Sequence, residues 1–295
     1  MKKLAGLTRI DLVVTLLCLL FILINVPVII AGGRQNAKLH VCMANLSALT
    51  DAWNMFADDN AEKIPSGDVY YSHSFPTPPG PQDGWFEWPH QWNTSTNPAD
   101  GSKSSPHSYS NISNPKLADW QHAIACGLLW KYVKNYNIYK CPMGQKGSFV
   151  TYAMPHSMNT WPNSGNGGSL TPNEFKAFEI RLRNQITAPA ERCVFLDEGA
   201  AGTGSFFIQY RTSTPIKWGD FPPMRHGKGT TFSFADGHAE YRLWTDPHTL
   251  AATPENCGWN QCPGDDCDCD LRWMTKITWG QVGRTCTDPA KQCED

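Results

Sequence analysis

LVVTLLCLLFILINVPVIIA, residues 12–31, precedes RQNAKLHVCMANLSALTDAWNMFADDN, residues 34–60. The first segment is almost continuously apolar, and a helix of that length, rising ~1.5 Å per residue, matches the ~30 Å hydrocarbon core of a bilayer. In the second segment apolar residues recur at spacings of three and four, which places them on one helical face. They are Leu39, Cys42, Leu46, Leu49, Trp53 and Phe56. We therefore expect one long helix over residues 7–60, membrane-spanning over about residues 10–31, whose second half packs on a globular domain.

Two other interpretations of the apolar run are a secretory signal peptide, which fits less well, and an ordinary single-pass anchor, which fits equally well. The run is too long for the core of a secretory signal peptide, and Ala31-Gly32-Gly33 is a poor cleavage site. An ordinary single-pass anchor fits the hydropathy as well as a more specialised segment does. Pro27 and the Gly32-Gly33 pair are candidates for a kink or an interruption of the helix.

The residues just before the run favour the specialised segment. Asp11 places a carboxylate just inside an apolar helix, where such a group is costly to bury and usually has a partner. Cleavage of the chain after Gly6 would create a free amine on Leu7. In a packed filament, this amine of one subunit could contact Asp11 of a neighbour.

The lysine pair at positions 2 and 3, Gly6, the apolar Leu7, Asp11 and the long apolar helix together resemble the class III prepilin signal of type IV pilins and type II secretion pseudopilins. The resemblance implies cleavage after Gly6 by a prepilin peptidase, which also methylates the new amine. Two residues depart from the pattern. Asp11 stands where the usual residue is Glu, and Arg9 stands where family members usually have an uncharged residue.

Two further phrases resemble prepilin-like proteins of planctomycete, verrucomicrobial and lentisphaeral genomes. One is GLLWKYVKNYNIYKCP, residues 127–142, which ends in Cys141-Pro142. The other is the segment from Cys42 to Pro65 that follows the apolar run. A lone Cys-Pro has no metal-site spacing, and Cys141 could pair with another cysteine.

The segment RHGKGTTFSFADGHAEYRLW, residues 225–244, predicts a β-hairpin. Residues alternate in character on both sides of Asp236-Gly237, and an Asp-Gly pair between two such runs is a strong signal for a two-residue turn. His226 precedes Asp236 with nine residues between them. This spacing matches the H-X9-DG motif of the prepilin-type processing-associated domain, whose name reflects co-occurrence with the N-terminal signal and not a chemical step.

The hairpin also offers metal ligands. His238 and Glu240 share one strand face, Asp236 could continue that face, and His226 could approach from the other end of the strand, so that the four would hold a divalent ion. The simpler expectation is that Asp236 shapes the turn, His226 bonds to nearby backbone, and the other two face solvent. A buried strand that ends in Asp197-Glu198 also has a ligand-binding and a structural interpretation. Strand-end carboxylates bind ligands or, more often, cap turns.

The C-terminal segment, residues 257–293, is rich in cysteine and aspartate. Its cysteine spacing lacks the paired C-x2-C knuckles of zinc ribbons, so disulfides are the better interpretation. Four acids could chelate calcium through oxygen, although the segment is not an EF-hand. They are Asp265, Asp266, Asp268 and Asp270. No other cofactor is expected.

Ten of the eleven cysteines lie outside the apolar run, and an even number in a domain outside the cytoplasm suits a disulfide framework. They are Cys42, Cys126, Cys141, Cys193, Cys257, Cys262, Cys267, Cys269, Cys286 and Cys293. A net charge of −2 shows no basic field, which makes nucleic acid an unsuitable partner. No Ser, Cys or Thr stands in a nucleophile context, so an enzyme is not expected.

These observations predict an α+β, pilin-like fold in which the long N-terminal helix packs on an antiparallel sheet with long loops. Residues 1–6 are the leader, 7–60 the helix, and 61–295 a domain outside the cytoplasm that includes the hairpin of residues 226–237. The expected location is the inner membrane, crossed once, with a cytoplasmic N-terminus. The expected partners are a prepilin peptidase, other pilin-like subunits, the secretion or pilus assembly machinery, and membrane lipid.

The resemblance implies a structural subunit of a type II secretion or pilus-like filament. The alternative is a surface module that binds polysaccharide or protein and uses the prepilin signal only for export. For that module, Trp85, Trp88 and Trp92 could stack on sugar rings. We favour the simpler interpretation that these tryptophans pin a long loop to the core.

Overall fold

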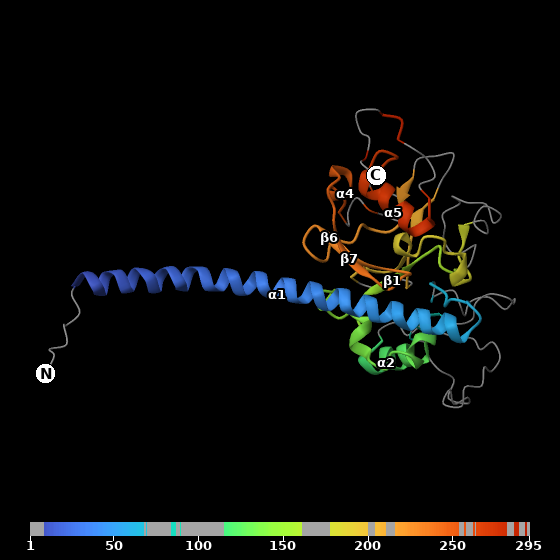
Figure 1. The fold of residues 1–295 in the computed structure, drawn as a ribbon, viewed down its shortest axis with the longest axis horizontal. Coiled ribbons are helices and arrows are strands. Elements are labelled where there is room, and N and C mark those ends of the chain that lie inside the picture. The colour runs from blue at the N-terminus through green and yellow to red at the C-terminus, as the bar shows by residue number, and fades with distance from the viewer. Residues whose placement is uncertain are drawn as a thin grey trace.

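A computed structural model gives the fold of the chain (Figure 1). It describes residues 9–67, 69, 84–86, 89, 115–160, 178–199, 204–210, 216–253, 257, 262, 264–281, 286–288 and 293, with only the backbone described for residues 22–31. Gly6, Leu7, Trp88 and Trp92 lie outside the described residues.

The first element, α1 (Arg9–Asp59), is a helix of 51 residues that continues through Pro27 and the Gly32-Gly33 pair. Figure 1 shows its N-terminal half projecting away from the rest of the molecule and its C-terminal half lying across the globular part. The predicted apolar stripe is confirmed in that second half. Cys42, Leu46, Leu49 and Trp53 are completely buried, and Phe56 packs at the edge of the same core.

The predicted membrane span is wrong, and with it the location as a single-pass inner-membrane protein. Among the described residues, no helix combines the length and the apolar character needed to cross a bilayer. Arg9 and Asp11 place two charges at the start of the described helix, where they would be costly to bury in the hydrocarbon of a bilayer.

The main sheet has five strands in the order β3-β1-β2-β6-β7. Neighbouring strands are antiparallel except β1 and β3, which are parallel, so the predicted antiparallel sheet is corrected to a mixed one. β3 follows β2 in the chain but pairs with β1 on the side away from β2, and it runs parallel to β1. The strands are β1 (Tyr152–Pro155), β2 (Cys193–Asp197), β3 (Ser205–Phe206), β6 (Gly229–Phe234) and β7 (Ala239–Leu243).

The hairpin of β6 and β7 is confirmed, with registers from Gly229↔Leu243 to Ser233↔Ala239. Its turn is longer than predicted. The backbone N–H of Phe234 donates to the His238 carbonyl, and the N–H of Gly237 donates to the Phe234 carbonyl, so the loop has three residues. Gly237 has a φ of 97°, the left-handed position that a three-residue hairpin loop requires.

The C-terminal half of α1 is held between two parts of the chain. It contacts β2, β6 and β7 of the sheet and also the 3-10 helices η2 (Leu128–Lys131) and η3 (Tyr136–Tyr139), which follow α2 (Leu117–Cys126). In Figure 1 the sheet and α2 lie on opposite sides of α1. Trp85 is buried in the core beside α1 and stacks on Tyr139, as the loop-pinning interpretation predicted for it.

A second core lies on the other side of the sheet, beneath α5 (Cys269–Trp279). Disulfides join Cys257 to Cys262, Cys267 to Cys286 and Cys269 to Cys293 around this helix. The remaining described elements are short. They are η4 (Arg183–Gln185), η5 (Pro189–Glu191), α4 (Pro247–Leu250) and a two-stranded sheet of β4 (Ile208–Gln209) and β5 (Lys217–Trp218).

The disulfide framework does not extend to the three buried cysteines outside this tail. Cys42, Cys141 and Cys193 are free thiols, so the pairing considered for Cys141 with another cysteine is wrong. Cys193 is enclosed within the second core, and the other two buried thiols belong to a cluster of polar groups described below.

Candidate functional site

The four hairpin residues considered for a metal site are not brought together. His226 precedes β6, whereas Asp236 and His238 follow it. A strand of six residues rising ~3.4 Å per residue separates the two groups by roughly 20 Å. The alternative of a four-residue metal site is therefore wrong, because the extended strand holds His226 apart from Asp236 and His238.

Asp236 and His238 form a surface pair at the turn. Nδ1 of His238 lies 2.6 Å from Oδ1 of Asp236, and both side chains are partly exposed. Partial burial acts to raise the pKa of Asp236, but hydrogen bonds from the side chain and backbone of His238 outweigh it and lower that pKa. The His238 ring also stacks on Phe234, with centroids 4.5 Å apart. These contacts shape the turn.

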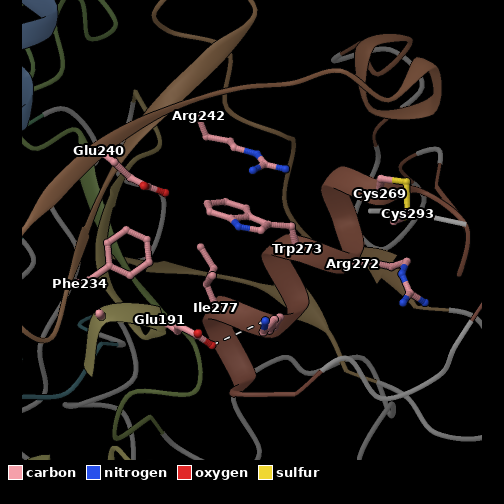
Figure 2. A pocket seen from close by; sticks show the side chains of 11 residues that line it. Glu191, Phe234, Glu240, Arg242, Cys269, Arg272, Trp273, Ile277 and Cys293 are labelled. Atoms are coloured by element: carbon pink, nitrogen blue, oxygen red, sulfur yellow. Dashed lines mark ion pairs between the residues drawn. A yellow bond between two sulfur atoms is a disulfide. The ribbon is translucent and has the colours of Figure 1, made fainter. Parts of the chain in front are cut away.

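Glu240 lies in a different place, at a pocket of about 340 Å³ between η5, β7 and α5 (Figure 2). In this pocket the guanidinium of Arg242 sits 4.5 Å from the ring centroid of Trp273. Lys276 pairs with Glu191 at 3.6 Å. Glu240 therefore belongs to a pocket of mixed charge and not to a site with His226.

The tail acids accept hydrogen bonds that hold the tail together. Asp268 caps α5 by accepting from the Leu271 N–H at 2.9 Å. Asp270 accepts from the backbone N–H of Thr245 at 2.7 Å and of Asp246 at 2.8 Å. Similarly, Asp265 accepts from Cys267, and Asp266 accepts from Ile216. Within the described ranges these acids do not gather into a group of metal ligands.

A buried cluster of four side chains is the chemically distinctive site. Cys42 comes from α1, Cys141 follows η3, Asp197 ends β2, and His226 precedes β6. One ligand atom from each lies within 4.8 Å of one from every other. Three of the residues are completely buried, and His226 is 7% exposed. In the described part of the chain, no other set of three or more such residues has this geometry.

The contacts inside the cluster connect all four residues. Nε2 of His226 lies 3.1 Å from Oδ2 of Asp197 and 3.3 Å from Sγ of Cys141. Sγ of Cys42 donates to the same Asp197 oxygen at 3.4 Å. Asp197 is thus the centre of a network that links the helix to the sheet.

A second set of donors surrounds the two sulfurs. The Tyr152 hydroxyl donates to Sγ of Cys42 at 3.4 Å, and Oγ1 of Thr231 lies 3.0 Å from the same atom. The backbone N–H of Met143 donates to Sγ of Cys141 at 3.3 Å. Both sulfurs therefore have polar neighbours besides the cluster itself.

Burial and close contact alter the acidity of these groups. Burial, together with hydrogen bonding to Cys141 and the Asp197 charge, raises the pKa of Cys42 far above its ordinary value. For Cys141, the hydrogen bond with Cys42 outweighs burial and lowers the pKa. Burial opposes protonation of His226, but its contacts with Asp197 and Cys141 prevail and raise its pKa to about 9.

The sequence contains only separate, weak signals for this cluster. Cys42 occurs in an apolar stripe, Cys141 in a Cys-Pro phrase, and Asp197 at the end of a buried strand. His226 was a candidate ligand in the company of the wrong partners, and Asp197 was considered only as a strand-end carboxylate without named partners. The four residues are spread over 185 positions of the chain, from 42 to 226, so no local spacing could reveal them.

The other unusual surface is the projecting half of α1. Its described apolar side chains are each at least half exposed, and they occupy nearly consecutive positions, so they surround the helix. They are Ile10, Leu12, Val13, Val14, Leu16, Leu17, Leu19, Leu20 and Phe21. Asp11 lies in the first turn of the same helix.

Comparison of the chain with protein-family models, with curated proteins and with solved structures finds no match.

Proposed function

We propose that the protein is a pilin-like structural subunit, in which the projecting half of α1 packs against the same half of neighbouring copies in a filament. The observation that carries this proposal is the set of nine apolar side chains around residues 10–21. A helix that is apolar all round is normally buried. Covering one such Leu or Val side chain stabilises an assembly by ~1.5–3 kcal/mol, before the costs of association.

The arrangement of these side chains favours many neighbours over one. A dimer would cover a single stripe of the helix and leave the other faces in water. Head-to-tail contacts repeated along a helical assembly cover all faces. The globular part, which is fastened to the other half of α1, would then lie on the outside of the filament.

The N-terminal residues support the same proposal through their resemblance to the prepilin signal. In this proposal a prepilin peptidase cleaves after Gly6, and the new amine of Leu7 contacts Asp11 of a neighbouring copy. Asp11 is an exposed residue in the first turn of α1, at the end of the projecting half. The H-X9-DG spacing from His226 to Gly237 is a second point of resemblance.

The test compares two aspartate substitutions on the same helix. Leu16 lies in the projecting half and is 57% exposed, whereas Met55 lies in the globular half and is 53% exposed. We expect the full chain to form large assemblies in sedimentation experiments, Leu16→Asp to shift it to monomers, and Met55→Asp to assemble like the unchanged protein.

Cys18 provides an independent readout, because it is an exposed thiol in the projecting half. A bis-maleimide reagent should link neighbouring chains through Cys18 in the assembly, and Cys18→Ser should abolish the linked dimer. A full chain that stays monomeric at high concentration, or a Leu16→Asp variant that still cross-links fully, would refute the proposed function.

A further inference from the structure

We propose that Cys42, Cys141, Asp197 and His226 bind one divalent transition-metal ion, zinc by the chemistry of the ligands, in a closed tetrahedral site. This inference does not depend on the proposed assembly, because all four residues lie in the globular part of the molecule. The site would fasten α1 to the sheet.

The ligand set and its spacing fit a tetrahedral ion. Two sulfurs, one imidazole nitrogen and one carboxylate oxygen are ligands that zinc accepts together. Bond lengths of ~2.0–2.3 Å place the ligand atoms of a tetrahedral site about 3.3–3.8 Å apart. In the cluster, Cys42 to Asp197 is 3.4 Å, Cys141 to His226 is 3.3 Å, and the longest separation is within 4.8 Å. Small side-chain shifts therefore suffice to admit the ion.

Two buried polar atoms of the cluster lack partners. Oδ1 of Asp197 and Nδ1 of His226 make no hydrogen bond within the described part of the chain. Leaving such an atom buried and unsatisfied costs about 1–3 kcal/mol. An ion bound at the carboxylate of Asp197 would offset this cost. Packing of the four side chains without an ion leaves the cost in place.

The surroundings suit thiolate ligands. The Tyr152 hydroxyl and the Met143 backbone N–H donate to the two sulfurs, and the Thr231 hydroxyl, which can donate to a thiolate, lies 3.0 Å from Cys42. Two thiolates and one carboxylate exceed the charge of a divalent ion by one negative charge, and these donors stabilise it. On binding, any proton held by the sulfurs or by Nε2 of His226 passes to solvent.

Burial of all four ligands indicates a structural ion. Catalytic zinc sites keep an open position for water or substrate, whereas structural sites are closed by protein ligands. Each ligand here comes from a different segment, so the binding energy of the ion would add directly to the stability of the contact between α1 and the sheet.

A disulfide between Cys42 and Cys141 is the competing use of the same two sulfurs. It would require an S–S separation of ~2.05 Å and would leave Asp197 and His226 as an isolated ion pair. The two outcomes differ in a measurable way. A metal site leaves both thiols reactive once the chain is unfolded, and a disulfide does not.

The first experiment measures metal content in the full chain purified without chelators. We expect about one zinc ion per chain by elemental analysis and by native mass spectrometry. Cys141→Ser and Asp197→Asn should reduce this content to near zero. Cys193→Ser is the matched control, because Cys193 is an equally buried free thiol outside the cluster, and it should keep the ion.

The second experiment does not depend on folding of the ligand variants. Alkylation of the denatured, unreduced wild-type chain should modify both Cys42 and Cys141. After chelation and loading with cobalt, the wild-type chain should show a thiolate-to-cobalt charge-transfer band and the visible bands of a tetrahedral ion. A Cys42–Cys141 disulfide, or a folded wild-type chain that neither carries nor takes up zinc or cobalt in stoichiometric amount, would overturn the proposal.

Discussion

Gly237 illustrates how much one residue of the H-X9-DG motif contributes to the fold. Its φ of 97° allows the chain to reverse between β6 and β7, and its carbonyl accepts a hydrogen bond from the Ser47 hydroxyl of α1 at 2.5 Å. An L-residue adopts this conformation only at a cost of roughly 1–2 kcal/mol. The glycine is therefore required by the backbone and not by any chemistry of the motif.

Replacing Gly237 by alanine should lower the free energy of unfolding by about 1–2 kcal/mol, measured by urea denaturation. Gly32→Ala is the control. Gly32 lies in the regular helix α1 with nothing near an added Cβ, so alanine there should be neutral or stabilise by up to about 1 kcal/mol. Equal effects of the two substitutions would contradict the role of the positive φ.

At the scale of elements, contacts near both ends of the strand β6 hold α1 on the sheet. Near its start, His226 reaches the cluster that contains Cys42. Near its end, Ser233 accepts from Thr50 at 2.7 Å, and the Ala235 carbonyl accepts from Asn54 at 3.3 Å. The segment from residue 226 to residue 237 thus contacts the cluster at the long helix near one end of β6 and the helix itself near the other end.

A second part of the fold, α5 with its disulfides, depends on covalent links for its stability. Cys269 and Cys293 are 24 residues apart, whereas Cys257 and Cys262 are 5 apart. In the chain-entropy account a longer closed loop gives a larger stabilisation. We expect the double change to serine at Cys269 and Cys293 to cost about 3 kcal/mol, and the same change at Cys257 and Cys262 about 2 kcal/mol, in chemical denaturation. The reverse order would show that the native contacts of α5, and not loop closure, decide the effect.

At the scale of the whole molecule, the globular part and the projecting half of α1 have separate roles. Among the described side chains of α1, Cys42 is the first that is completely buried, and no described residue before it belongs to either core. The projecting half therefore contributes apolar surface without contributing to the described cores.

A chain that begins at Arg34 should accordingly remain folded and lose assembly. We expect its thermal midpoint to lie within a few degrees of that of the full chain, since a change of about 1 kcal/mol shifts the midpoint by only ~2–4 °C for a domain of this size. Near-UV circular dichroism and sedimentation measure the two properties. A truncated chain that unfolds, or one that still forms large assemblies, would show that the division between the two parts is misplaced.

The sequence by itself determined the features that depend on local periodicity. The spacing from Leu39 to Phe56 placed one helix face in the core, and the alternation around Asp236-Gly237 placed the hairpin, because helix and strand periods are set by the backbone alone. Hydropathy, in contrast, predicted a membrane span, and no helix among the described residues has the length and apolar character for one.

Only the tertiary structure decided which polar groups meet. The extended β6 separated His226 from Asp236 and His238, and the packing of α1 on the sheet brought Cys42, Cys141 and Asp197 to His226 instead. Contacts between residues far apart in the chain carry no local signature, because they arise from the packing of whole elements. For the same reason the two residues of β3 carry no local signal that they pair in parallel with β1.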